Sequence, residues 1–159
     1  MSPGKTLLHV GCGTSDVGPK LAAEPDLGLQ VTDIDDSASA VRIMCRRHRQ
    51  TKGYRCSRAN ALNLPFPQGK FDAVVDKGTF DALLCRSHKD AQNMAVEVHR
   101  VLRKGGIFLQ ITNEDPDLRL DLLKGREEKK QNTQGWSRRI FREIGSGEQV
   151  TYYLYILVK

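Results

Sequence analysis

The chain has 159 residues, 39% hydrophobic residues and a net charge of +6, which fits one folded domain and not a disordered chain. Its mean hydropathy is −0.47 and its apolar runs are too short for a transmembrane helix, so no membrane role is expected. Met1–Lys5 lead straight into an apolar run, so no secretory signal is expected. Four cysteines without a CxxC pair exclude a disulfide scaffold and favour a reducing compartment.

Strand and helix signals alternate along the first half of the chain. We expect a buried strand over 6–10, a short helix over 15–23 and a second strand over 29–34. Ser37 is the expected N-cap of a helix that runs to about residue 48. A loop or short strand around 54–59 and a third clear strand over 71–76 follow. This alternation predicts an α/β fold with a parallel sheet.

The second half begins with a short helix over 82–87 and an amphipathic helix over 88–103. The apolar positions of the longer helix are Ala91, Met94, Ala95, Val98, Val101 and Leu102. A buried strand over 107–111 and a charged helical stretch over 118–130 come next. The last two strands, over 136–144 and 150–158, have no helix between them and are expected to pair antiparallel.

A glycine turn joins the first strand to the first helix, as Gly11-Cys12-Gly13. Glycine lets the backbone approach a nucleotide closely and adopts positive φ. Dinucleotide sites carry a third glycine near a pyrophosphate, whereas this chain has Asp16 there. A carboxylate beside a diphosphate is unfavourable, so NAD and FAD are disfavoured. A nucleoside without phosphate would not be repelled by this carboxylate.

Three acids follow the second strand and compete for one role. Asp35 lies 24 residues after Gly11, near the spacing at which a carboxylate accepts hydrogen bonds from ribose hydroxyls. Asp33 and Asp36 are rivals, and a solvated turn is the alternative for all three. We prefer Asp35 because the helix that begins at Ser37 places it at the tip of the strand.

The glycine turn, the acid at 35, Asn60-Ala61-Leu62-Asn63-Leu64-Pro65-Phe66 and Phe71-Asp72-Ala73-Val74-Val75-Asp76 occur in one order. This order resembles the class I S-adenosylmethionine-dependent methyltransferases. The resemblance implies a Rossmann-like three-layer sandwich with a mostly parallel seven-stranded sheet and an antiparallel C-terminal hairpin. The family usually has Asp where Asn60 stands, to contact the adenine amine. By resemblance, the cofactor-binding residues are Gly11, Cys12, Gly13, Ile34, Asp35, Asn60, Ala61, Asp76 and Lys77.

A second set of motifs narrows the resemblance to the branch that methylates protein lysines. Asp76-Lys77-Gly78-Thr79-Phe80-Asp81-Ala82 resembles that branch, elongation-factor lysine methyltransferases included. Residues 8–15, 113–120 and 151–155 are most similar to members that act on citrate synthase in mitochondria. The resemblance implies transfer to a lysine ε-amine, citrate synthase as a candidate partner and the mitochondrial matrix as location, with the cytoplasm as alternative.

The resemblance also suggests roles at the methyl-transfer centre. Asp76, Lys77, Gly78 and Thr79 are expected to line it, with Asp81 below them. Glu114 and Asp115 follow the next strand and are expected to hold the substrate ammonium. Capping is the alternative for these acids: Asp81 would cap the helix over 82–87, and Glu114 and Asp115 the helix that Pro116 starts.

The family carries a helical segment before the first strand, and this chain starts only a few residues ahead of it. We therefore expect a single methyltransferase domain over 1–159 that lacks this segment, with a cofactor site open on one side.

Other interpretations remain open. Seven basic residues and no acid lie between Arg42 and Arg58, which favours an RNA or small-molecule methyltransferase, although nucleic acid is the less expected partner. A non-catalytic binding module is the third hypothesis. No metal site is expected, because Cys45 with His48 and Cys85 with His88 lack the spacing of a strong zinc signature. His9 is expected to be a core histidine bonded to backbone.

Overall fold

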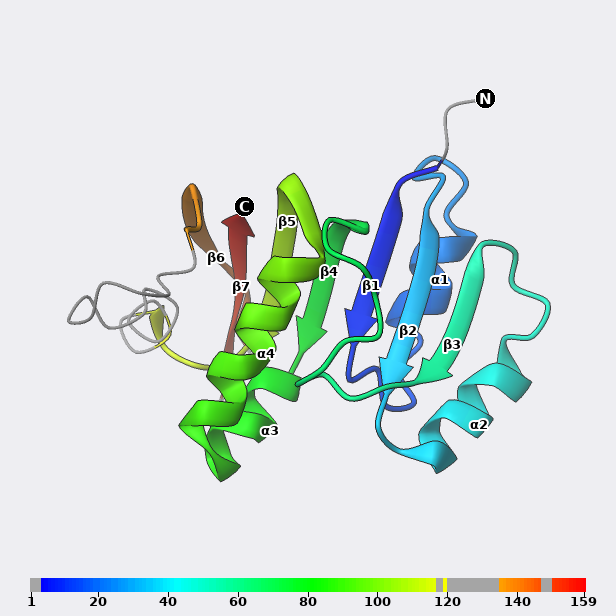
Figure 1. The fold of residues 1–159 in the computed structure, drawn as a ribbon, viewed down its shortest axis with the longest axis horizontal. Coiled ribbons are helices and arrows are strands. Elements are labelled where there is room, and N and C mark those ends of the chain that lie inside the picture. Colours follow the sequence, from blue (N-terminus) through cyan, green and yellow to red (C-terminus); the bar gives the residue numbers. More distant parts are fainter. Residues whose placement is uncertain (1–3, 117–118, 120–134, 147–149) are drawn as a thin grey trace.

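The computed structural model describes residues 4–116, 119, 135–146 and 150–159 (Figure 1). In chain order, its elements are β1 (Thr6–Val10), α1 (Val17–Ala23), β2 (Gln30–Asp35), α2 (Ala38–Arg47), β3 (Tyr54–Arg58), β4 (Phe71–Lys77), α3 (Thr79–Arg86), α4 (His88–Val101), β5 (Leu102–Thr112), β6 (Arg138–Ser146) and β7 (Thr151–Val158).

The seven strands of the described part form one sheet in the order β3-β2-β1-β4-β5-β7-β6 (Figure 1). β1 pairs in parallel with β2 and β4, and the parallel arrangement extends to β3 and β5. β7 pairs antiparallel with both β5 and β6. The predicted α/β fold with an antiparallel C-terminal hairpin is therefore confirmed.

Helices cover both faces of the sheet, because successive strand residues point to opposite sides. Leu7 packs with Val31, Val75 and the α1 residue Leu21 on one face. Leu8 belongs to the larger core on the other face, with the buried side of α4. In Figure 1, α3 and α4 lie in front of the sheet and α1 behind it. The result is the expected three-layer sandwich.

Several helix positions expected from local sequence patterns agree with the structure. The Ser37 hydroxyl caps α2 by accepting from the Ala40 N–H at 3.3 Å. All six apolar positions predicted for the long helix are buried. Leu102 nevertheless belongs to β5, because α4 ends at Val101.

Two expectations differ from the structure, and a third lies almost entirely outside the described residues. The helix expected over 82–87 begins earlier, at Thr79, with Gly78 at its N-cap. Trp136 precedes β6 instead of starting it, and its ring stacks on Phe108 in the core. The helical stretch expected over 118–130 falls outside the described residues except for Arg119.

Candidate active site

A cavity of about 490 Å³ opens where β1, β2 and β4 end. The chain runs from β1 outward to β3, then crosses back to β4 on the other side of β1. Open α/β sheets bind ligands at such a switch point, outside the carboxyl ends of the strands. The walls come from the ends of these strands, the loop after β3, α3 and the start of α4: Gly11, Ile34, Asp35, Asp36, Ala59, Asn60, Ala61, Leu62, Lys77, Gly78, Thr79, Ala82, Leu83, Arg86 and Asp90.

The floor of the cavity is the turn after β1, held against the turn after β4. Gly11 has φ +60, and a Cβ built on it would overlap the Thr79 hydroxyl. That hydroxyl lies 3.1 Å from the Val10 carbonyl and 3.3 Å from the Gly11 carbonyl, both of which accept from it. The two turns can approach this closely only because residue 11 has no side chain.

Asp35 lies at the tip of β2 and faces the cavity. Its Oδ2 accepts from the Gly13 N–H at 2.7 Å and its Oδ1 from the Ser37 N–H at 2.9 Å. These bonds fix the carboxylate between the glycine turn and α2, with lone pairs left for further donors. The exposed Asp36 also lines the cavity. The preference for Asp35 over Asp36 stays a prediction.

Asp33 is fully buried and is not among the residues that line the cavity. Its Oδ2 accepts from the Tyr54 hydroxyl at 2.9 Å, and its Oδ1 lies 3.3 Å from His9 Nδ1. Neither ring nitrogen of His9 has a hydrogen-bond partner in the described part of the chain. The expectation that His9 bonds to backbone is therefore wrong, and Asp33 is a core residue that no cavity ligand reaches.

The other predicted cofactor residues fall into two groups. Gly11, Ile34, Asn60, Ala61 and Lys77 line the cavity with Asp35. The Asn60 side-chain carbonyl accepts from the Leu62 N–H at 2.9 Å, which orients the amide.

Cys12 and Gly13 are not part of the cavity wall. Cys12 is buried, and a hydrogen bond with Cys56, together with burial, raises the pKa of its thiol. The Cys12 side chain is therefore a protonated spacer in the turn.

Asp76 ends β4 but lies behind the wall, 2% exposed. Its carboxylate accepts from the N–H groups of Thr79 at 2.9 Å and Phe80 at 3.3 Å, and from Gln110 Nε2 at 3.1 Å. It thereby satisfies the free N–H groups at the start of α3. Gly78, with φ +84, makes the turn between them possible. Asp76 therefore does not line the cavity itself, and its hydrogen bonds hold the cavity-lining residues 77–79 in place.

Asp76 leads to a prediction about pH. Burial, with a smaller contribution from the charge of Asp81, raises its pKa to about 6. The native state then holds an extra proton between about pH 4 and pH 6, so this group destabilises the fold as the pH rises through that window. Asp76→Asn cannot ionise. Relative to wild type, its free energy of unfolding should rise by up to about 3 kcal/mol between pH 4 and pH 7. Urea titrations at both pH values measure it, and a pH-independent difference would contradict the assignment.

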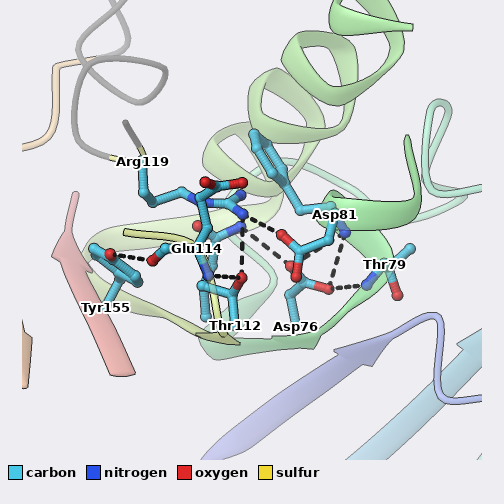
Figure 2. Close-up of polar contacts among 9 residues, drawn as sticks. Asp76, Thr79, Asp81, Thr112, Glu114, Arg119 and Tyr155 are labelled. Atoms are coloured by element: carbon cyan, nitrogen blue, oxygen red, sulfur yellow. Dashed lines mark hydrogen bonds and ion pairs between the residues drawn. The ribbon is translucent and has the colours of Figure 1, made fainter. Parts of the chain in front are cut away.

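The remaining predicted acids form a separate group (Figure 2). Asp81 lies in the first turn of α3 and forms an ion pair with Arg119, so the alternative that Asp81 caps a helix is wrong. The Glu114 N–H donates to Thr112 Oγ1 at 3.0 Å, and its carbonyl accepts from the Tyr155 hydroxyl at 2.9 Å. Asp81, Glu114 and Asp115 are not among the residues that line the cavity. Substrate contact by Glu114 and Asp115 stays a prediction, and so does a role for Asp81 below the methyl-transfer centre.

Within the described ranges, no three His, Cys, Asp or Glu side chains come together to hold a metal ion. Cys45, singled out by its spacing from His48, instead donates its thiol to the Cys56 carbonyl at 3.2 Å. No helix of residues 4–116, 119, 135–146 and 150–159 is both long and apolar enough to cross a membrane.

Sequence reasoning missed Arg86 and Asp90, which line the cavity beside Ala82 and Leu83. Ala82 and Arg86 are four residues apart and so share one helix face, a signal visible in the sequence. Only the packing of α3 against the sheet shows that this face turns toward the cavity.

Comparisons with known proteins agree on one family. A family model described as a methyltransferase domain matches residues 8–110. The mitochondrial citrate synthase-lysine N-methyltransferase of Danio rerio is 34% identical over 94% of this chain and 62% of its own length. EEF1A lysine methyltransferase 4 of Bos taurus is 31% identical over 97% of this chain and 61% of its own length. The chain thus spans less than two thirds of each relative.

A solved structure supports the fold independently. A SAM-dependent methyltransferase from Methanosarcina mazei superposes with a TM-score of 0.72, covering 100% of this chain and 94% of that one. Because the sequence identity is 18%, this similarity supports the fold and nothing more.

Proposed function

The chain belongs to the class I S-adenosylmethionine-dependent methyltransferases, and we propose that it transfers a methyl group to the ε-amine of a lysine in a protein. The relatives named for lysine methylation support the acceptor class, at 34% and 31% identity. Citrate synthase is the first candidate substrate and EEF1A the second, since these are the proteins in the relatives' names. The mitochondrial matrix is the proposed location, with the cytoplasm as the alternative.

The single observation that carries the proposal is the cavity where Gly11, Asp35 and Thr79 converge. A glycine that lets the ligand approach the backbone and a fixed carboxylate suit a nucleoside without phosphate. The carboxylate accepts hydrogen bonds from the ribose hydroxyls, and a ligand without phosphate is not repelled by the acids. Gly11, Ile34, Asp35, Asn60, Ala61 and Lys77 would hold S-adenosylmethionine, with Cys12 and Gly13 shaping the turn. The sulfonium of that cofactor supplies a methyl group open to attack by an amine.

The protein must then deliver an uncharged amine to this place. A lysine in water has a pKa near 10.4, so a site that methylates it must remove its proton or desolvate it. Residues 77–79 line the cavity at the end of β4, and we assign the acceptor amine to this turn. Holding the amine in line for attack is the main contribution such a site makes, worth up to ~7–11 kcal/mol in favourable cases. Asp76 contributes by keeping the turn in place.

An RNA substrate is less favoured by the structure. Enzymes that modify bases hold the target base by stacking it on aromatic or apolar side chains. The described cavity wall contains apolar side chains such as Ile34 and Leu62 but no aromatic one. The basic residues between 42 and 58 lie on α2 and β3 and in the loop that joins them, outside that wall.

Label transfer tests the proposal. The purified chain is incubated with a cell extract and S-adenosylmethionine tritiated in the methyl group. We expect label that protease releases and nuclease does not, and that is lost when the lysines of the extract are acetylated beforehand. Label confined to nuclease-sensitive material would instead support the RNA alternative. Absence of both transfer and cofactor binding would support the non-catalytic module.

A further inference from the structure

Arg119 is the largest fully buried side chain in the described part of the protein. It lies one turn after Asp115, whose carbonyl accepts from the Arg119 N–H at 3.0 Å. The guanidinium lies 4.7 Å from the centre of the Phe80 ring. Figure 2 shows its Nη2 directed at both Asp81 and Thr112 Oγ1, the latter at 3.3 Å.

In the described part of the protein, the carboxylate of Asp81 forms an ion pair with this cation. Nε and Nη1 of Arg119 are buried without a hydrogen-bond partner in the described residues. A buried charge is tolerated when it is paired, and removing its partner leaves an uncompensated ion. Asp81 is different, because its side chain keeps 29% of its surface exposed. Water can therefore hydrate the carboxylate if Arg119 is removed.

Asp81 is also close to the proposed methyl-transfer centre. It lies in the first turn of α3, between the cavity-lining residues Thr79 and Ala82. Its charge is one of the causes that raise the pKa of Asp76, directly behind that wall. A carboxylate this close to an acceptor amine would stabilise the ammonium form, which cannot attack a methyl group.

We propose that Arg119 is a positioning residue that keeps the Asp81 carboxylate paired and away from the acceptor lysine, so that the lysine loses its proton near neutral pH. The inference rests on the proposed lysine-methyltransferase function and goes beyond it by assigning Arg119 and Asp81 a joint role. The charged and titratable groups on the elements around this turn include, in the described part, Asp76 and Lys77 on β4, Arg86 on α3, Asp90 on α4, Glu114, Asp115 and Arg119 after β5, and Tyr155 on β7.

The test compares Arg119→Met, Arg119→Lys, Asp81→Asn and the double variant Arg119→Met with Asp81→Asn. The rate of tritiated-methyl transfer to purified citrate synthase and EEF1A is measured between pH 6 and pH 10. Arg119→Met should shift the pH of half-maximal rate upward by about one unit and lower the rate at pH 7.5 about ten-fold, with an unchanged or lower KM for the protein. Arg119→Lys and the double variant should keep the wild-type profile. Arg46→Met, an exposed change on α2, is the matched control.

Thermal unfolding of the same proteins gives a readout that needs no activity. Asp81→Asn should lower Tm most, because it leaves the buried cation unpaired, and the double variant should recover Tm. Additive changes in Tm would overturn the pairing, and a wild-type pH profile for Arg119→Met would overturn the positioning role. If wild type binds the cofactor but methylates no lysine, the proposed function fails and this inference fails with it.

Discussion

Replacing Gly11 by alanine is expected to abolish measurable binding of S-adenosylmethionine. Residue 11 has φ +60, and an added Cβ would overlap the Thr79 hydroxyl and approach its Cγ2 to 2.7 Å. An L side chain in this conformation costs roughly 1–2 kcal/mol before any contact is counted. Relief requires the turn after β1 to move away from the turn after β4, which breaks the bonds that Thr79 makes to the Val10 and Gly11 carbonyls. Isothermal calorimetry measures the binding.

Gly13→Ala separates backbone strain from the steric clash. Gly13 has φ +53, so alanine there is strained to a similar degree, but a Cβ at this position meets nothing within 4 Å. We expect Gly13→Ala to weaken binding far less than Gly11→Ala. Equal losses in the two variants would mean that the contact between the turns is not what holds the cavity open. Circular dichroism shows whether each variant is folded.

Asp35→Ala is expected to raise the Kd for S-adenosylmethionine by roughly 10–100-fold, since hydrogen bonds to a charged group contribute about 1.5–3 kcal/mol. The loss has two sources. The ribose hydroxyls lose their acceptor, and the N–H groups of Gly13 and Ser37 lose the carboxylate that orders them.

The neighbouring acid provides the control for Asp35. Asp36 lines the same cavity and carries the same charge. Within the described residues, its backbone carbonyl accepts from Arg58 Nε at 2.9 Å, and its carboxylate accepts no hydrogen bond. Asp36→Ala therefore preserves that bond. If the negative charge alone matters little, the Kd for S-adenosylmethionine should change less than three-fold, which corresponds to a change in binding free energy of roughly 0.6 kcal/mol. A larger effect at 36 than at 35 would reverse the assignment of the sugar-binding acid.

Much of the fold could be predicted from local patterns. The cap at Ser37 involves residues only three positions apart, and the apolar stripe of α4 repeats every three or four residues. Sequence spacing is therefore enough to place each of them. The start of α3 could not be placed in this way. It depends on the Asp76 carboxylate, which accepts from Thr79 and Phe80 only when the Gly78 turn brings it over the helix end.

The site shows the same division between local and long-range causes. The glycine turn and Asp35 follow a spacing that the sequence displays directly. Asp33 is the same residue type two positions earlier and points to the same face of β2. It lies inside the strand against Gly18 of α1, with its carboxylate near His9 and Tyr54, and so it does not reach the cavity. Arg119 gives no local sign of its role, because its partner Asp81 lies 38 residues earlier in the chain. Buried ion pairs of this kind follow from tertiary packing.

The central claim is methyl transfer to a protein lysine, and peptide mass spectrometry tests it most directly. Citrate synthase and EEF1A are each incubated with S-adenosylmethionine and either the wild-type chain or Gly11→Ala. We expect the mass of one or more added methyl groups on a lysine-containing peptide of one of the two proteins after incubation with wild type, and no added mass after incubation with Gly11→Ala. If wild type binds the cofactor in calorimetry and both proteins remain unmodified, while RNA in a cell extract gains methyl groups from the same enzyme and cofactor, lysine methylation is not the reaction.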